Sequence, residues 1–168
     1  ATPTPRPTAT PTPTPGPTAT PTPTPAGGTL PATTWYLFNT NVSGVTPAGQ
    51  IMQTTKSGTT GWQPTRTINT TAAYWYASAQ TGTYNAGTYT FYLWTNNPGS
   101  ASNVTVTLYK VNADGSGAVQ LGTQTLNAGQ SATGNHATTY TFSGVGAVSL
   151  SNQRLMVKIV KASGVDCT

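Results

Sequence analysis

The first 25 residues of the chain form a threonine–proline repeat. Ten of these residues are proline and ten are threonine, and the pattern Ala-Thr-Pro-Thr-Pro recurs at Ala1, Ala9 and Ala19. Proline lacks a backbone N–H, fixes φ and drives the preceding residue towards extended conformations, so this segment can form neither a helix nor an inner strand. We therefore predict an extended polyproline II arm over residues 1–28, followed by one folded domain over residues 29–168.

The predicted arm is long compared with the domain that follows it. At ~3.1 Å per residue the repeat would reach about 78 Å, whereas a compact body made of the rest of the chain would be roughly 40 Å across. An arm of this length favours two roles: a stalk that holds the domain away from a surface, or a strap that lies across neighbouring molecules.

Nearly every second residue of the arm is a hydroxyl next to a proline, a composition typical of O-glycosylated stalks, with a bare spacer as the alternative. The candidate sites are Thr4, Thr10, Thr12, Thr14, Thr20, Thr22 and Thr24. Three N-glycosylation sequons begin at Asn41, Asn69 and Asn103. Chance alone explains most such sequons in a chain this rich in asparagine and threonine.

Charge is scarce throughout the chain. Only 5% of the residues are charged, with seven basic residues, two acids and a formal net charge of +5; typical soluble proteins have about 25%. The bases are scattered, which argues against nucleic-acid binding, and no apolar run is long enough to span a membrane. The chain lacks an initiating Met and a visible signal peptide, so we expect a mature or excised segment located outside the cell or on its surface.

The inventory of reactive side chains argues against an enzyme. The two acids, Asp114 and Asp166, lie in a predicted turn and in the tail, and a glycosidase would need two carboxylates on either side of the scissile bond. The single histidine, His136, has no acid near it in sequence, and a zinc site would need three or four ligands. We expect no catalysis, no metal and no cofactor. Cys167 is the only cysteine, so it is either an intermolecular disulfide partner or an incidental tail thiol.

After a short joint at Ala26-Gly27-Gly28 the pattern becomes that of β-strands: short runs rich in Thr, Val, Tyr, Phe and Trp, separated by Gly, Asn, Pro and Ser. We predict an all-β fold, an antiparallel two-sheet sandwich of the jelly-roll or immunoglobulin-like kind. The predicted strands are Thr34–Asn39, Gln50–Thr55, Ala72–Ala79, Gly87–Asn96, Asn103–Val111, Val119–Leu126, Ala137–Phe142, Ala147–Leu150 and Arg154–Lys161.

Alternation predicts which side chains face the core. Val104, Val106 and Leu108 should point inward in one strand, and Leu155, Val157 and Ile159 inward in another, with Met156 outward. Three other strands carry large aromatic residues on both faces, for example Trp75 opposite Tyr74 and Tyr76. In a two-layer sandwich, one face of each sheet is exposed to solvent. The outward aromatic residues therefore need a cover, which could be the loop Ser57–Gln63, a sugar or another subunit.

The whole layout resembles secreted bacterial or archaeal surface proteins in which a Thr/Pro-rich linker joins β-sandwich modules. The resemblance is carried by composition and by the run Gly87-Thr-Tyr-Thr-Phe-Tyr-Leu-Trp-Thr-Asn-Asn-Pro-Gly. It implies either a pilin-like or adhesin-like subunit or a carbohydrate-binding module.

Two functional hypotheses follow. The first is a structural subunit of an extracellular filament or surface assembly, a homopolymer in which the arm docks on aromatic residues of the next copy. The second is a carbohydrate-binding module on a glycosylated stalk, whose aromatic rings stack on polysaccharide. Both hypotheses use the same candidate residues: Trp35, Trp62, Trp75, Tyr92, Trp94 and Tyr109.

Overall fold

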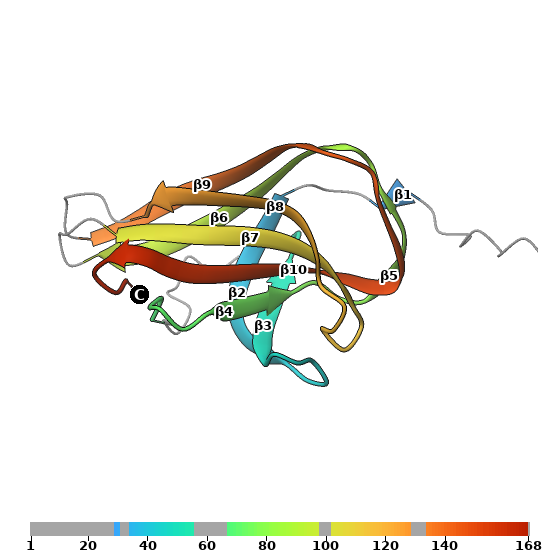
Figure 1. The fold of residues 1–168 in the computed structure, drawn as a ribbon, viewed down its shortest axis with the longest axis horizontal. Coiled ribbons are helices and arrows are strands. Elements are labelled where there is room, and N and C mark those ends of the chain that lie inside the picture. The colour runs from blue at the N-terminus through green and yellow to red at the C-terminus, as the bar shows by residue number, and fades with distance from the viewer. Residues whose placement is uncertain (1–28, 31–33, 56–66, 98–101, 129–133, 168) are drawn as a thin grey trace, which may run out of the picture.

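The computed structural model describes residues 29–30, 34–55, 67–97, 102–128 and 134–167, and within them every regular element is a β-strand (Figure 1). The predicted all-β class is thereby confirmed. The predicted arm, the candidate threonines within it, the loop Ser57–Gln63 and Trp62 lie outside the described residues. The strands are β1 (Thr29–Leu30), β2 (Thr34–Val42), β3 (Gly49–Gln53), β4 (Ala73–Tyr76), β5 (Gln80–Tyr84), β6 (Gly87–Asn97), β7 (Ser102–Asn112), β8 (Val119–Asn127), β9 (Gly134–Val145) and β10 (Val148–Gly164).

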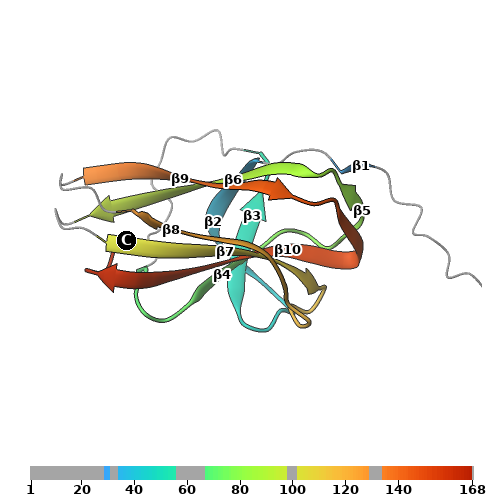
Figure 2. The same ribbon diagram turned by 45° about the horizontal axis from the view of Figure 1, so that its top comes forward.

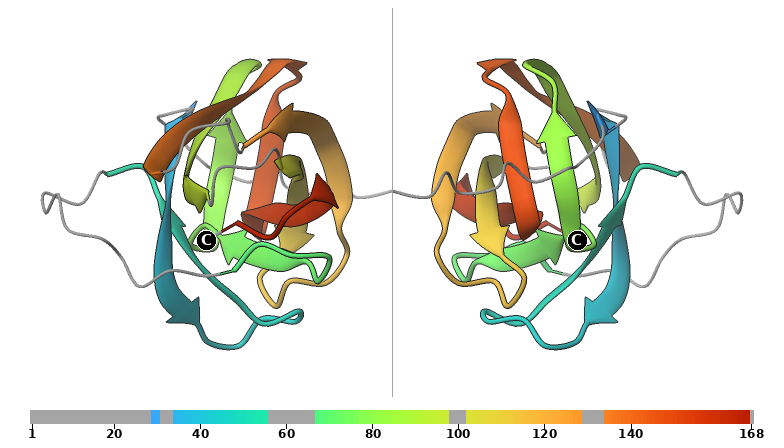
Figure 3. Two further views of the ribbon diagram at one scale, coloured as in Figure 1. Left: turned by 90° about the vertical axis from the view of Figure 1, so that its left-hand side faces the viewer. Right: turned by 90° about the vertical axis from the view of Figure 1, so that its right-hand side faces the viewer.

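The strands form one mixed sheet that curls into a nearly closed barrel. The pairing runs β9–β6–β2–β3–β4–β10–β7–β8, and β5 pairs with the first part of β10 and carries β1 on its other edge. Seen end-on, the strands surround a common interior (Figure 3). The edge strands β8 and β9 approach each other without a ladder. A side chain bridges them instead, because the Thr141 N–H donates to Gln124 Oε1 at 2.9 Å.

This pairing corrects the prediction of two separate antiparallel sheets. Three pairs of strands are parallel: β1 with β5, β2 with β6, and β3 with β4. The segment between β3 and β4 is long enough to carry the chain back before β4 begins, and parallel neighbours require such a crossover. In Figures 1 and 2, β2 and β3 lie steeply across the long strands β7 and β10.

Strand boundaries were only partly predictable. The two segments predicted at Ala147–Leu150 and Arg154–Lys161 belong to one strand, β10, which bends at a register shift between Leu150 and Gln153. The strand β5 was not predicted, because its sequence Gln-Thr-Gly-Thr-Tyr is polar and contains a glycine. Strand β9 begins at Gly134, so His136 lies in a strand rather than in the predicted loop.

The main core lies inside the barrel and follows the predicted alternation. Val104, Val106 and Leu108 of β7 are at most 1% exposed, and Val157 and Ile159 of β10 are fully buried. Aromatic rings fill the remaining interior, with edge-to-face pairs between Trp35 and Tyr84, between Tyr84 and Tyr89, and between Phe91 and Phe142.

A second, smaller core lies on the other side of β4 and β10. Tyr76, Val111 and Met156 are buried there beneath half-buried Val42, Val45, Tyr74 and Tyr109. Met156 lies on the face opposite Leu155 and Val157, as predicted, but it is only 3% exposed, which corrects the expectation that this face is open to solvent. The cover is the turn between β2 and β3: the Tyr76 hydroxyl donates to Pro47 O at 2.7 Å, and the Thr46 N–H donates to Asp114 O at 2.8 Å. A loop thus covers part of the second aromatic face. The loop Ser57–Gln63, which was considered as a cover from the sequence, lies outside the described residues.

Candidate functional site

A row of four side chains crosses the face of β3, β2, β6 and β9. Tyr36 of β2 pairs with Gln53 of β3 on one side and with Tyr92 of β6 on the other, and Tyr92 pairs with Thr139 of β9. Residues in register on neighbouring strands point to the same face. We refer to Gln53, Tyr36, Tyr92 and Thr139 as the tyrosine row.

The two rings of the tyrosine row are stacked on each other. Their centroids are 6.0 Å apart and their planes differ by 19°. Both tyrosines are half-buried, and Gln53 and Thr139 at the two ends of the row are exposed. An aromatic surface flanked by amide and hydroxyl groups can pack against a sugar ring or a proline ring and donate hydrogen bonds at its margins.

Two of the predicted contact residues face the interior. Trp35 is 2% exposed and Trp75 is 5% exposed. Trp75 Nε1–H donates to Phe38 O at 3.0 Å, whereas Trp35 Nε1 has no hydrogen-bond partner in the described part of the chain. Neither ring presents a face to a partner molecule in this structure. The sequence could not show this, because both strands carry aromatic residues on their two faces.

The remaining candidates lie elsewhere. Tyr92 belongs to the tyrosine row, and half-buried Tyr109 packs over the second core. The backbone of Trp94 lies in β6, in register with Ala137, but its side chain is outside the description. Tyr36 was missed as a site residue. Tyr36 follows Trp35 in β2 and therefore lies on the opposite face of the strand, and this alternation could have identified it as a surface residue.

The three sequon asparagines differ in their surroundings. Asn41 is exposed at the end of β2, and Asn103 is exposed but donates from Nδ2 to Ser163 Oγ at 2.9 Å. Asn69 is half-buried and accepts the Thr71 N–H at Oδ1 at 2.7 Å. Of the three side chains, that of Asn41 is the most accessible to a modifying enzyme.

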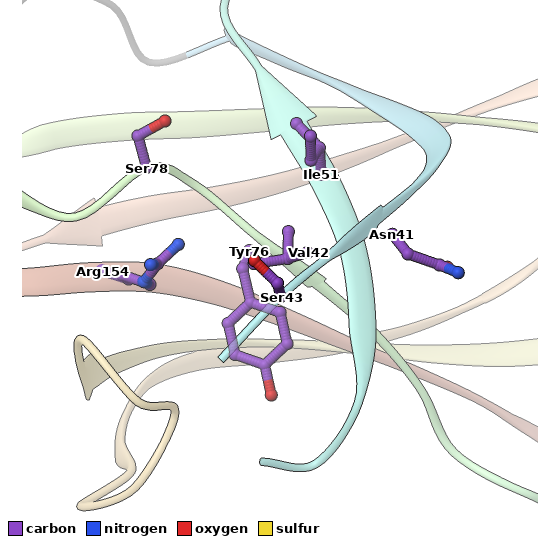
Figure 4. Close-up of a pocket in the computed structure, with 7 residues that line it drawn as sticks. All are labelled: Asn41, Val42, Ser43, Ile51, Tyr76, Ser78 and Arg154. Atoms are coloured by element: carbon purple, nitrogen blue, oxygen red, sulfur yellow. The ribbon is translucent and has the colours of Figure 1, made fainter. Parts of the chain in front are cut away.

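A pocket of about 240 Å³ opens between the end of β2 and strands β3, β4 and β10 (Figure 4). In the close-up, the guanidinium group of Arg154 lies on one side and the side chain of Asn41 on the other. The rest of the lining comes from Val42, Ser43, Ile51, Tyr76 and Ser78.

Arg154 is held in place by backbone carbonyl groups. Its Nε–H donates to Ala113 O at 2.7 Å and its Nη1–H donates to Ala77 O at 3.2 Å. The chain contains only two acidic side chains. Asp166 pairs with Lys161, and Asp114 accepts the Ser116 N–H at 2.9 Å and the Ser116 hydroxyl at 2.7 Å. These bonds from Ser116 hold the pKa of Asp114 below its usual range.

Cys167 is a core residue rather than a surface thiol. It is fully buried, and its backbone forms a bridge with Ile68, with N–H···O distances of 2.6 and 3.2 Å. Burial raises the pKa of its thiol. Neither an intermolecular disulfide nor thiol chemistry is accessible to the residue in this conformation.

The described residues hold no group of three or more His, Cys, Asp or Glu side chains that could bind a metal ion. No helix capable of crossing a membrane occurs among them. Neither a protein-family model, nor a curated protein, nor a solved structure matches the chain.

Proposed function

We propose that the chain is a structural subunit of an extracellular filament or surface assembly, a homopolymer in which the Thr/Pro arm of one subunit docks on its neighbour. The observation that supports this proposal is the position of β1 and of the end of β10 in the domain. The strand that follows the arm, β1, lies at one end of the long axis of the domain, and β10 runs to the other end (Figures 1 and 2). Such a polarity suits head-to-tail contacts, which produce open filaments when the rotation between subunits does not close a ring.

The edges of the sheet also favour assembly. β1 pairs with β5 on one side, and its other side has no strand partner in the described part of the chain. Neither β1 nor β5 contains a charged residue. Natural proteins commonly protect exposed edges with charges, with proline or by keeping the edge strand very short. This edge lacks charge, although β1 has only two residues and Pro31 follows it in the sequence. We propose that a neighbouring copy adds a strand to this edge next to the arm.

The tyrosine row is the docking surface that we propose for the arm. Proline-rich segments in the polyproline II conformation bind to grooves lined by aromatic rings. The stacked, half-buried Tyr36 and Tyr92 supply two such rings, and exposed Gln53 and Thr139 can donate hydrogen bonds to arm carbonyls. We also propose O-glycosylation of the arm threonines, which would stiffen the arm and suits the same extracellular location.

Removal of the arm tests the filament directly. Deletion of residues 1–25 should give a folded monomer, whereas the full chain should sediment as filaments visible by negative-stain electron microscopy. A matched variant keeps the length of the arm but replaces its prolines with serine, and it should also fail to polymerise because the extended conformation is lost. Normal filaments from the truncated chain would overturn the proposal.

A carbohydrate-binding module is the second candidate function, and the half-buried aromatic rings of the tyrosine row, with polar side chains at both ends, are the observation in its favour. Stacked aromatic rings with polar margins bind sugar rings as readily as proline rings. The double substitution Tyr36→Ala with Tyr92→Ala separates the two functions when applied to the full chain and to the truncated domain. Loss of polysaccharide binding by the truncated domain would support a carbohydrate-binding module, whereas loss of filaments by the full chain with unchanged polysaccharide binding would support the structural subunit.

A further inference from the structure

The pocket beside Arg154 combines a fixed positive charge with polar groups at its rim. Nε and Nη1 of Arg154 are occupied by the carbonyl groups of Ala113 and Ala77, so the guanidinium plane is held rigid. Nη2 has no partner among the described residues. Its two N–H groups, with the second N–H of Nη1, remain available as donors.

No side-chain carboxylate forms an ion pair with this guanidinium group in the described part of the chain. Both acidic side chains lie among the described residues and are bound elsewhere, Asp114 by Ser116 and Asp166 by Lys161. No salt bridge to Arg154 is present in the described part of the chain. A half-buried guanidinium without a counter-ion attracts an anion from solution, and its planar donors match an oxyanion.

The remaining lining indicates what the anion is attached to. Exposed Asn41, Ser43 and Ser78 offer amide and hydroxyl groups, and half-buried Val42 and Ile51 offer apolar surface. Sugar rings present this combination of hydroxyl groups and C–H faces. A volume of about 240 Å³ suits one ring-sized group rather than a long chain segment.

We propose that this pocket binds one acidic sugar residue of a polysaccharide, with its carboxylate on Arg154 and its hydroxyl groups on Asn41, Ser43 and Ser78. The pocket is lined by none of the residues of the tyrosine row, so the proposal stands independently of the function proposed above.

The test titrates the full-length chain with an oligogalacturonate and follows binding by isothermal titration calorimetry. Ser78→Asp places a carboxylate in the pocket without removing either carbonyl bond of Arg154, so it should weaken binding at least tenfold. Ser143→Asp, at an exposed position in β9 outside the pocket, changes the net charge equally and should leave binding unchanged. Arg154→Gln should also abolish binding, and its circular dichroism spectrum reports whether the fold survives.

Two further ligands identify the source of the affinity. A neutral oligosaccharide of the same length should not bind, and sodium acetate should bind far more weakly than the oligogalacturonate, because it lacks the hydroxyl groups. Saturable binding that Ser78→Asp weakens and Ser143→Asp does not would support the proposal. Absence of saturable binding, equal loss in both aspartate variants, or equal affinity for the neutral oligosaccharide would overturn it.

Discussion

Gly49 lies directly against the ring of Tyr76. A Cβ atom at position 49 would be 2.5 Å from Tyr76 Cε2 and 2.6 Å from the carbonyl oxygen of Tyr74. Both distances are shorter than van der Waals contact. The close approach brings β3 and the preceding turn down onto Tyr76, which is fully buried in the second core.

Gly49→Ala should therefore destabilise the domain. The Tyr74 carbonyl oxygen belongs to the backbone and cannot move aside cheaply, so we expect a loss of about 1–3 kcal/mol in the free energy of unfolding. Gly146→Ala is the matched control, because a Cβ there meets no atom within 4 Å. Urea denaturation of the two variants measures the difference, and equal stabilities would contradict the close packing described for Gly49.

Because of the buried tyrosines, the free energy of unfolding should depend on pH in the alkaline range. Burial raises the pKa of Tyr76 and of Tyr84 to about 12, from 10.0 for an unperturbed tyrosine. The unfolded chain therefore releases these protons at lower pH than the folded chain. The stabilisation is fully present below pH 10 and is lost as the pH rises from 10 towards 12, by about 1.4 kcal/mol per pH unit for each tyrosine.

Denaturation midpoints measured from pH 8 to pH 11.5 would show this loss. Tyr84→Phe removes one ionisable group from the core and should reduce the slope of stability against pH above pH 10. A flat profile for the unmodified protein over this range would show that these two phenols ionise as freely in the folded state as in the unfolded state.

The two buried tryptophans should respond differently to the same substitution. Trp75→Phe removes the donor to Phe38 O, whereas Trp35→Phe removes an N–H that has no partner in the described part of the chain. Both substitutions remove a similar ring volume. We expect Trp75→Phe to cost about 1–2 kcal/mol more than Trp35→Phe in the free energy of unfolding. Chemical denaturation of both variants decides the matter, and a larger cost for Trp35→Phe would show that its indole N–H is hydrogen-bonded in solution.

Cys167 should be unreactive while the domain is folded. Its side chain is fully buried and burial raises the pKa of its thiol, so the reactive thiolate is both rare and inaccessible. A thiol-specific chromogenic reagent should label the native protein far more slowly than the protein in denaturant. Rapid native labelling, or a disulfide-linked dimer on a non-reducing gel, would contradict the buried position.

The core of β7 could be predicted from the sequence because one of its faces is consistently apolar. Val104, Val106 and Leu108 alternate with threonines, and the register of β7 with β8 places Thr105 beside Thr125, with hydroxyl oxygens 2.7 Å apart. In β4 and β10 the alternation separated the two faces correctly but did not predict that the second face is covered. Met156 was expected to be exposed there, and it is buried in the second core instead.

The candidate sites depend on pairings that no local pattern encodes. Tyr36 and Tyr92 are far apart in the sequence and meet only because β2 and β6 are parallel neighbours. In the sequence, Arg154 is one of three bases that lie close together, with Lys158 and Lys161, and nothing distinguishes it from the other two. Its significance comes from the two carbonyl groups that fix it and from the lack of an acidic partner, and only the lack of acids could be read from the composition.

The gap between β8 and β9 has a mechanical consequence. Elsewhere around the barrel, neighbouring strands are joined by rows of main-chain hydrogen bonds, but here the contact includes the amide of Gln124 and the packing of Gly122 against Phe142. A tensile load applied across the wall would meet its least resistance along this line. Opening the wall there breaks no main-chain ladder, but it exposes Tyr140 and Phe142 of the main core to water, so the packing of these rings is what resists the load.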